Sequence, residues 1–247
     1  MENSKERLNK FLARCGVGSR RESDLLIQQG RVSVNNIFIE NPVCFVGQKD
    51  IVKVDGEKIG SPGKVRLWRY HKPVGQVTTH SDPERRLTVF KAVSGQDPSL
   101  PRLVSIGRLD INSEGLLLLT NAGSLSHKLE MPSNNWTRRY SVRAYGNMPE
   151  TFIEKAAKGL KIDGEQYRSI HISLESRQGA NAWYLVTLKE GKNREIRKIF
   201  EYFGLRVNRL IRTAFGPFQL GSLPKGAIEE IPQRVLKDQL GKEYASL

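Results

Sequence analysis

A series of short segments rich in β-branched and aromatic residues dominates the chain after residue 60. Gly, Asn or Pro bounds each segment, as is typical of strands joined by turns. Because these segments outnumber the helical stretches, we predict an α+β fold built on a mixed, largely antiparallel sheet with flanking helices. The segments are KVRLWRYHKPVGQVTT (64–79), LVSIGRLD (103–110), GLLLLTN (115–121), RRYSVRAYG (138–146), ANAWYLVTLKEG (180–191) and RLIRTAFGPFQLG (209–221).

Two stretches in this region have apolar residues at helical spacing instead. The first is PETFIEKAAKGL (149–160), and the second begins near Asn193 and ends at Gly204. On the second helix, Arg194 and Arg197 should share the face opposite the apolar stripe. The residues expected to point inward are Phe152, Ile153, Ala156 and Leu160 in the first helix, and Ile196, Ile199, Phe200 and Phe203 in the second.

The first 60 residues predict a separate module of two helices followed by strands. Ser19 and Glu22 form an S-x-x-E capping box for the second helix, which should end at Gly30. Alternating apolar residues around Asn35–Asn36 indicate a hairpin. Seven basic residues against three acidic ones between residues 5 and 31 favour an RNA-binding role, although a solvated helix face has the same pattern. The first helix is indicated by Leu8, Phe11, Leu12 and Cys15.

Gly, Ser and Pro are concentrated in IGSPGK (59–64), which predicts a linker between two folded regions. We therefore divide the chain into an N-terminal module at 1–60, a linker at 61–65, a second domain at 66–236 and a C-terminal tail at 237–247. The residues after Gln233 should form a short polar helix.

The balance of charge restricts the partners of the chain. Lys and Arg number 40 against 26 Asp and Glu, which gives a net charge of +14 and favours polyanions. A membrane partner is disfavoured because no apolar run approaches the roughly 18 residues of a spanning helix. Two scattered cysteines and four scattered histidines form no metal-ligand pattern, and no glycine-rich phosphate loop occurs. We expect neither a metal nor a cofactor, and a reducing, cytoplasmic location.

One acid stands out in GRLDINSEGLLLLTNAG (107–123), where Asp110 lies between Arg108 and an apolar strand. It could be an ordinary turn residue or a nucleophile. An arginine of the basic segment 189–212 could pair with it, and a carboxylate held as an anion serves as a nucleophile or base. A retaining glycosidase would need a second acid, but Glu114 is expected to face solvent. Chemistry alone leaves an RNA-directed enzyme and a plain RNA-binding protein equally open.

The motif around Asp110 closely resembles the catalytic motif of pseudouridine synthases, in the branch that modifies ribosomal RNA. The N-terminal module resembles an S4 RNA-binding domain, and the whole chain is most similar to the bacterial large-subunit (23S) rRNA pseudouridine synthase B group. Further segments resemble the same branch in the same order: HKPVGQVTTHSDPERRLTVF (71–90), PSNNWTRRYSVRAYG (132–146), EGKNREIRKIFEYFGLRVNRLIR (190–212) and AFGPFQLGSLPKG (214–226).

The resemblance implies a catalytic role for four residues. Asp110 matches the family's nucleophile, and Tyr140 the tyrosine that stacks on the flipped base. Arg197 matches the basic residue that pairs with the aspartate. Leu210 matches the apolar residue that packs against uracil, with Ile211 as the alternative. Attack at C6, attack at C1′ and a glycal route all stay open, and the reaction requires no cofactor.

The resemblance also implies ribosomal RNA as the partner, either free 23S rRNA or a subunit assembly intermediate, bound by a monomer in the cytoplasm. A 16S rRNA enzyme and a non-catalytic ribosome-assembly factor are the alternatives. The cations expected to contact RNA are Arg7, Lys10, Arg20, Arg21 and Arg31 in the N-terminal module, and Lys72, Arg85, Arg86, Arg108, Lys192 and Arg194 in the second domain.

Overall fold

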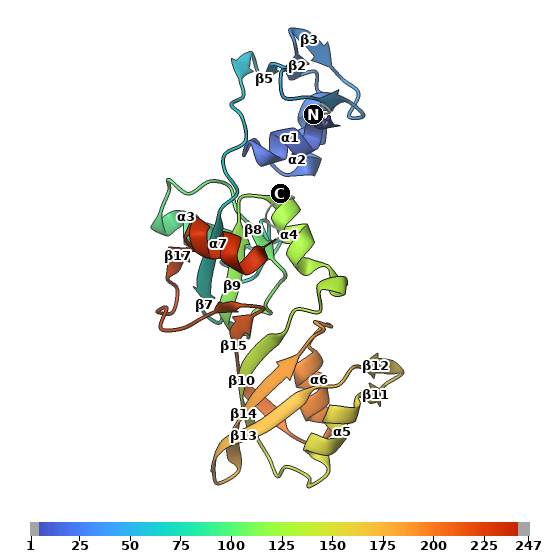
Figure 1. Ribbon diagram of the computed structural model, residues 1–247, viewed down its shortest axis with the longest axis vertical. Coiled ribbons are helices and arrows are strands. Elements are labelled where there is room, and N and C mark those ends of the chain that lie inside the picture. Colours follow the sequence, from blue (N-terminus) through green and yellow to red (C-terminus); the bar gives the residue numbers. More distant parts are fainter. Residues whose placement is uncertain (1–4, 242–247) are drawn as a thin grey trace. The chain divides into compact units, whose positions relative to one another are not determined.

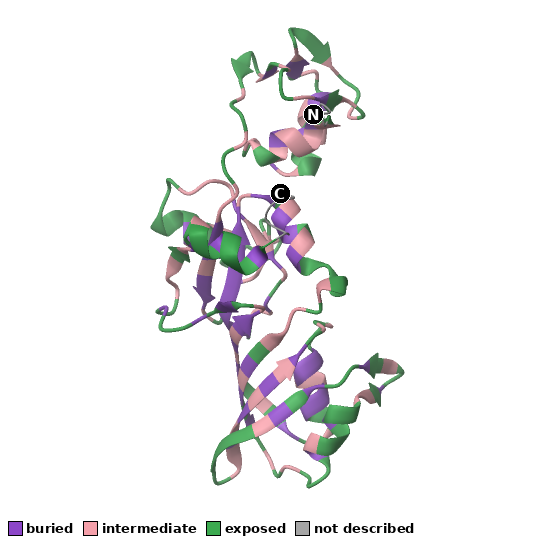
Figure 2. Ribbon diagram, viewed as in Figure 1, coloured by how far each residue is buried: buried purple, intermediate pink, exposed green. Residues whose placement is uncertain are grey.

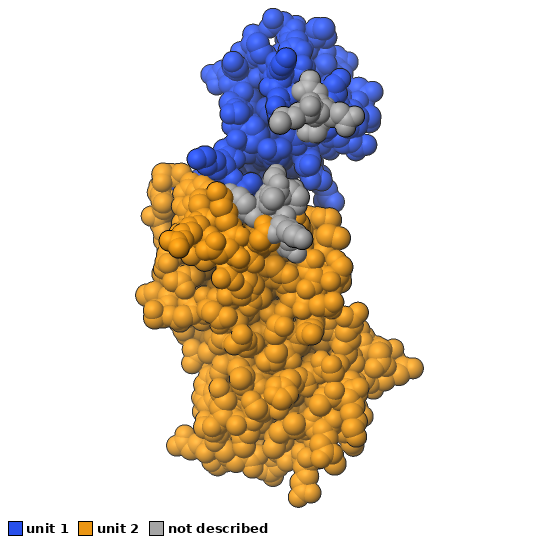
Figure 3. Space-filling model, in the orientation of Figure 1, with its two compact units in different colours: residues 1–65, 100–102, 121–123 blue, residues 66–99, 103–120, 124–247 orange. Residues whose placement is uncertain are grey.

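The computed structural model describes residues 5–241 (Figure 1). Buried residues lie in several separate parts of the chain (Figure 2). The chain divides into two compact units, coloured separately in Figure 3. Unit 1 comprises residues 1–65, 100–102 and 121–123, and unit 2 comprises residues 66–99, 103–120 and 124–247. No helix in the described part of the chain is long and apolar enough to cross a membrane.

The described part of unit 1 contains two helices and two small sheets around an apolar core. The capping box predicted at Ser19 and Glu22 is confirmed, and Asn35 and Asn36 both have positive φ in the hairpin turn. The core consists of Leu8, Leu12, Ile27, Val32, Val46 and Val52. The elements are β1 (Glu6–Arg7), α1 (Leu8–Arg14), α2 (Arg20–Gln28), β2 (Val32–Val34), β3 (Ile37–Ile39), β4 (Phe45–Val46), β5 (Val52–Val54) and β6 (Glu57–Lys58). Strand β1 pairs with β4, and the larger sheet has the order β3-β2-β5-β6.

Unit 2 is built on a nine-stranded sheet with the order β13-β14-β10-β15-β9-β7-β17, to which β8 and β16 are added beside β9 and β15. Only β9 and β15 pair in parallel among the described strands, so the predicted mixed, largely antiparallel sheet is confirmed. All of β9 is buried (Figure 2). The strands are β7 (Leu67–Lys72), β8 (Val104–Ile106), β9 (Glu114–Thr120), β10 (Arg138–Tyr145), β13 (His171–Gln178), β14 (Asn181–Leu188), β15 (Arg206–Phe215), β16 (Phe218–Gln219) and β17 (Ile228–Glu230).

The helices of unit 2 correct three details of the sequence prediction. Leu160 lies in a strand after the helix and is only half-buried. Arg194 precedes its helix in a left-handed conformation, so it does not share a helical face with Arg197. The helix predicted after Gln233 is confirmed, but it buries Leu236 and Leu240 instead of being wholly polar. The tail predicted at 237–247 therefore begins inside this helix, and residues 242–247 lie outside the described part. The remaining elements are α3 (Val89–Gln96), α4 (Gly123–Glu130), a 3-10 turn (Pro132–Asn134), α5 (Phe152–Lys158), β11 (Leu160–Ile162), β12 (Glu165–Tyr167), α6 (Glu195–Tyr202) and α7 (Gln233–Leu240).

A two-residue parallel pairing joins β9 to β15 at the point where the candidate site lies. Glu114 is opposite Ile211, and Gly115 is opposite Arg212. Gly115 has a φ of +105°, and a Cβ atom there would lie 2.3 Å from the Arg212 carbonyl oxygen. Only glycine permits this approach. The pairing therefore holds the turn that precedes β9, which contains Asp110, beside β15.

Candidate active site

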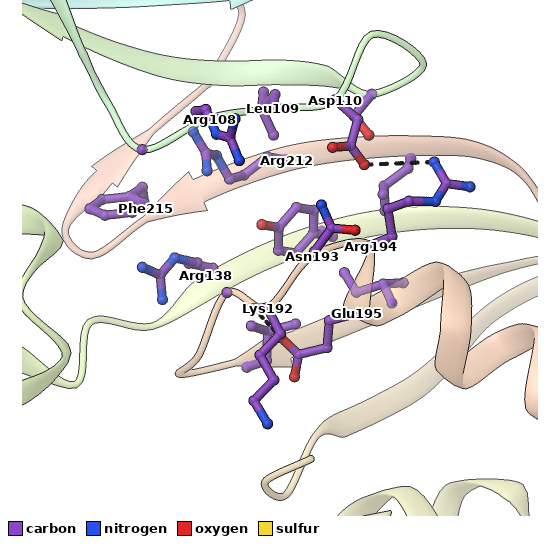
Figure 4. A pocket seen from close by; sticks show the side chains of 17 residues that line it. Arg108, Leu109, Asp110, Arg138, Lys192, Asn193, Arg194, Glu195, Arg212 and Phe215 are labelled. Atoms are coloured by element: carbon purple, nitrogen blue, oxygen red, sulfur yellow. Dashed lines mark hydrogen bonds and ion pairs between the residues drawn. The ribbon is translucent and has the colours of Figure 1, made fainter. Parts of the chain in front are cut away.

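A pocket of about 200 Å³ lies where four segments of unit 2 meet. Figure 4 shows Asp110 and Arg194 on one side of it, and Arg138, Arg212 and Phe215 gathered on the other. The lining residues used below are Arg108, Leu109, Asp110, Arg138, Tyr140, Lys192, Arg194, Glu195, Leu210, Arg212 and Phe215.

A buried lysine binds the backbone of the turn that contains Asp110. The Nζ of Lys72 donates to the carbonyl oxygens of Pro73 (3.0 Å), Asp110 (3.1 Å) and Ser113 (2.8 Å). Burial lowers the pKa of Lys72 to about 8, although Asp110 and Glu114 act in the opposite direction. Lys72 is fully buried, so the prediction that it contacts RNA is wrong. Its three carbonyl partners show that it fixes the backbone that carries Asp110.

The structure places an unexpected cation at Asp110. The ion pair at this carboxylate comes from Arg194, at 3.9 Å, rather than from Arg197. Arg197 donates instead to the carbonyl oxygens of Asn112 (2.8 Å) and Val207 (3.0 Å). Burial and the nearby Arg194 lower the pKa of Arg197, while Asp110 acts against this change. Arg197 thus fastens α6 to the Asp110 turn and to β15.

Two residues implied by the family resemblance meet in the pocket from neighbouring strands. Tyr140 on β10 pairs with Arg212 on β15, and Val142 two residues later pairs with Leu210. Tyr140 and Leu210 are 8% and 7% exposed, and both line the pocket. Ile211, the alternative to Leu210, is half-buried and is not a lining residue. An aromatic ring and an aliphatic side chain therefore face the space beside Asp110.

The prediction that Glu114 faces solvent is wrong. Its side chain is 3% exposed and forms ion pairs with Arg209 and, at 2.7 Å, with Lys225. Burial raises the pKa of Glu114, but the hydrogen bonds from these two cations outweigh it, so the pKa is lowered. Glu114 does not line the pocket. It therefore holds β9 to its neighbours rather than supplying a second carboxylate to Asp110.

Sequence reasoning missed Glu195, a buried carboxyl group in the pocket lining. Burial and the neighbouring Glu190 raise its pKa to about 8. Its Oε2 accepts a hydrogen bond from the Lys192 backbone N–H at 3.0 Å, whereas Oε1 is buried without a partner among the described residues. Its position four residues before Ile199, on the apolar stripe of α6, was the available signal.

The cations of unit 1 that are predicted to contact RNA differ in whether an acidic side chain already pairs with them. Arg7, Arg20 and Arg21 are exposed. Lys10 lies 3.9 Å from Glu6, and Arg31 forms a two-pronged pair with Asp55 through Nε (2.8 Å) and Nη2 (2.6 Å). A polyanion would have to compete with these acids for Lys10 and Arg31.

The predicted RNA contacts of unit 2 lie partly at the pocket. Arg108 and Arg194 are exposed lining residues, and Lys192 lines the pocket while donating to the Gln166 carbonyl. Arg85 is exposed, whereas Arg86 pairs with Asp82 at 2.7 Å and with Glu84 at 3.1 Å. A second, more open hollow continues from Asp110 and is lined by Val77, Thr78, Thr79, Asp82, Arg86, Arg108, Leu109, Ile111, Asn193 and Arg194.

Comparison with protein families identifies this arrangement. Residues 66–202 match the model of the family described as RNA pseudouridylate synthase. The chain belongs to this family. Residues 6–42, which span β1 to β3 of unit 1, match the S4 domain. The chain is therefore an RNA pseudouridine synthase with an N-terminal S4 domain, and it is an isomerase.

Named relatives and a solved structure agree with the family. An uncharacterized RNA pseudouridine synthase of Rickettsia prowazekii is 49% identical over 95% of this chain and 97% of that protein. The ribosomal large subunit pseudouridine synthase B of Yersinia pestis is 39% identical over 92% of this chain and 72% of that protein. A crystal structure of a pseudouridylate synthase superposes with a TM-score of 0.64 at 25% identity, over 95% of this chain and 99% of that one. The synthase thus shares its fold along nearly its whole length with this solved enzyme.

Proposed function

We propose that this synthase converts one uridine of 23S rRNA to pseudouridine, with Asp110 as the nucleophile. The similarity to a synthase named for the large ribosomal subunit supports the substrate. The observation that carries the nucleophile is the placement of Asp110 in the pocket lining, with Tyr140 and Leu210 from neighbouring strands. The side chain of Asp110 is 38% exposed, so a substrate can reach its carboxylate.

The reaction breaks the C1′–N1 bond, turns the detached uracil and rejoins it through C5. A carboxylate can begin this by attack at C6 or at C1′, or by assisting elimination. Lys72 and Arg197 fix the turn that carries Asp110 through backbone carbonyls, and Arg194 orients its carboxylate. Such preorganisation is a major source of rate enhancement, because the catalytic group is already in place before the reaction begins.

The target base must leave its stack before it enters the pocket, at a cost of a few kcal/mol. Stacking on Tyr140 and apolar contact with Leu210 would offset part of this cost. Arg197 would serve by holding the Asn112 carbonyl, two residues from Asp110, rather than by pairing with the carboxylate.

Exposed cations would position the rRNA around the pocket without reading its sequence. Arg108 lies at the pocket beside Arg194, whose charge is shared with Asp110, Arg85 lies on the nearby exposed loop, and the S4 domain adds Arg7, Arg20 and Arg21. Lys10, Arg31, Arg86 and Lys192 would contribute less, because acids or a carbonyl already engage them. We further propose that the synthase acts as a monomer in the cytoplasm, on free 23S rRNA or on an assembling large subunit.

Pseudouridine mapping of rRNA tests the proposal. Cells that lack the gene are complemented with the wild type or with Asp110→Ala, and carbodiimide adducts are detected as primer-extension stops. We expect one stop in 23S rRNA to disappear in the deletion strain and to return only with the wild type. A stop lost in 16S rRNA would instead identify the rRNA of the small subunit as the substrate. No change in any stop would favour a non-catalytic assembly factor.

A further inference from the structure

A buried cation faces the same pocket and has no role in the mechanism so far. Arg212 on β15 is 3% exposed and lines the pocket. Its Nε donates to the Leu116 carbonyl oxygen at 2.7 Å. Its Nη2 is buried and has no hydrogen-bond partner among residues 5–241. One end of the guanidinium is therefore anchored to β9, whereas Nη2 at the other end has no acceptor among the described residues.

The surroundings of Arg212 increase the cost in folding stability of leaving Nη2 without an acceptor. Burial lowers the pKa of Arg212 and Arg138 acts in the same direction, although Tyr140 offsets part of this change. The guanidinium lies 5.4 Å from the centre of the Phe215 ring, and no ion pair to it occurs in the described part of the chain. A buried charged donor without an acceptor destabilises a fold unless a ligand or water completes it. The position in the pocket points to a ligand.

We propose that Arg212 is a further catalytic residue, whose free guanidinium nitrogen donates a hydrogen bond to a carbonyl oxygen of the uracil ring and stabilises negative charge on that ring. The inference rests on the proposed function, since it requires uracil beside Asp110. Figure 4 shows Arg212 across the pocket from Asp110. A uracil whose C6, or whose attached C1′, faces Asp110 would turn its opposite edge toward Arg212.

The electron count of the reaction explains why such a donor is needed. When the C1′–N1 bond breaks, its electron pair moves to the uracil ring and is shared among N1, O2 and O4. If Asp110 attacks C1′, an ester bond to C1′ forms as the C1′–N1 bond breaks. The ring's electron pair is used again when C5 attacks C1′ and displaces the Asp110 carboxylate, after which C5 loses a proton and N1 gains one. The ring therefore carries excess negative charge only between the two steps. A fixed cation in a water-poor pocket stabilises charge of this kind strongly.

A phosphate group is a less suitable acceptor for Arg212. Tyr140, Leu210 and Phe215 line the pocket beside it, and it is 3% exposed. The exposed lining cations Arg108 and Arg194 are better placed for a solvated phosphodiester. A contact to phosphate would change RNA affinity and its salt dependence, whereas a contact to the ring would change the rate of the chemical step.

Arg212→Met and Arg212→Lys separate these roles. The substrate is an RNA fragment that carries the uridine identified by mapping, and single-turnover rates are measured with saturating enzyme. We expect Arg212→Met to slow isomerisation by about 10²- to 10³-fold, and Arg212→Lys to recover part of the rate. The Kd for RNA should stay within about threefold. Arg206→Met is the matched control, because Arg206 is an exposed residue of the same strand, and it should retain the wild-type rate.

Thio-substituted uridines make the test independent of folding defects. Sulfur is the poorer hydrogen-bond acceptor, so the thio-uridine that replaces the contacted oxygen should slow the wild type by about tenfold. The same substitution should slow Arg212→Met by less than about twofold, because the contact is already lost. Equal slowing of both enzymes by 2-thiouridine and by 4-thiouridine would overturn the inference, as would a full rate for Arg212→Met. A weakened Kd with an unchanged rate would assign Arg212 to a phosphate.

Failure of the proposed function gives a different result. In that case the wild-type enzyme converts no uridine in the mapping experiment, and the inference falls with it before any Arg212 variant is measured. If the wild type is active and Asp110→Ala is inactive, the function stands, and the Arg212 variants alone decide the inference.

Discussion

The two units place their charged residues in opposite ways. In unit 1 the core residues are all apolar, and cations such as Arg20 and Arg21 are exposed or, like Arg31, paired at the surface. In unit 2 the residues around the pocket include buried charged side chains. These are Lys72, Glu114, Glu195 and Arg212.

This difference indicates two roles for charged residues, one in binding RNA and one in building the pocket. An exposed ion pair contributes at most about 1 kcal/mol to stability, so exposed cations are available to a polyanion at little cost. A buried charge costs several kcal/mol unless other groups satisfy it, so its place in a pocket calls for a geometric or chemical reason. Substitutions in unit 1 should therefore change RNA affinity, whereas those around the pocket should change rate.

Asp110→Asn should give the largest effect on rate. The variant keeps the shape of the side chain but removes the nucleophile, so we expect single-turnover isomerisation to fall by at least about 10⁴-fold. The RNA Kd should change by less than about threefold. Asp163→Asn, at an exposed turn of unit 2, is the control and should retain activity. Measurable turnover by Asp110→Asn would remove Asp110 as the nucleophile.

Lys72→Met tests whether a buried cation acts only through geometry. Loss of the three carbonyl contacts should let the Asp110 turn shift, and a displacement of about 1 Å can cost about 10²-fold in rate. The slope of log Kd against log salt should equal that of the wild type. Lys91→Met, at an exposed helical position, should change neither quantity. A reduced salt slope for Lys72→Met would return Lys72 to the RNA-binding surface.

Arg20→Gln combined with Arg21→Gln tests the exposed cations of unit 1. If each contacts one phosphate of a single strand, the salt slope should fall by about 1.4, and affinity should drop by about 25-fold at 0.1 M salt. The single-turnover rate at saturation should not change. Arg31→Gln should have a smaller effect, because Asp55 already neutralises Arg31. A slower chemical step in the double variant would contradict the division of roles between the units.

Glu195→Gln should have the smallest effect on rate and should instead change stability in a way that depends on pH. The pKa of Glu195 is raised from 4.5 to about 8 in the folded state, so between these values the folded chain holds a proton that the unfolded chain has lost. Stability therefore falls as pH rises from 4.5 to 8. Glutamine needs no proton, so the variant should gain about 1 to 3 kcal/mol relative to the wild type between pH 5 and pH 8. Thermal unfolding across this range measures the gain.

The exposed Glu201→Gln on the same helix is the control for Glu195. Its unfolding curves should follow the wild type at each pH. If Glu195→Gln shows the same pH dependence as the wild type, then the buried carboxyl group does not hold the proton.

Features determined by neighbouring residues could be predicted from the sequence. The Ser19 capping box and the turn at Asn35–Asn36 depend on contacts within a few residues, and both are confirmed. The helix at residues 195–202 was predicted from its apolar spacing, but its start was misplaced by about two residues. That error put Arg194 on the helix, whereas its left-handed conformation directs it to Asp110.

Burial of charged residues could not be predicted in this way. Lys72 and Glu114 are predicted to be exposed, because no pattern in the neighbouring sequence indicates which distant strands cover them. Glu114 is buried where β9 meets β15, and its partner Arg209 is 95 residues away in the sequence. The candidate roles of Asp110 and Tyr140 follow only from resemblance to a family, because their spacing also fits a turn residue and a strand residue of the core.

The pairing of β9 with β15 also determines which part of the chain can fold first during synthesis. The hydrogen bond from Arg212 to Leu116 joins residues 96 apart in the sequence. The entropic cost of closing this loop must be met before β15 can contribute its residues to the pocket. The helices and strands of unit 1 all lie within residues 6–58 and depend on local contacts. Since folding follows emergence from the ribosome, a nascent chain completes the elements of its S4 domain well before it can complete its active site. The growing protein gains the means to hold RNA before it gains the means to modify it.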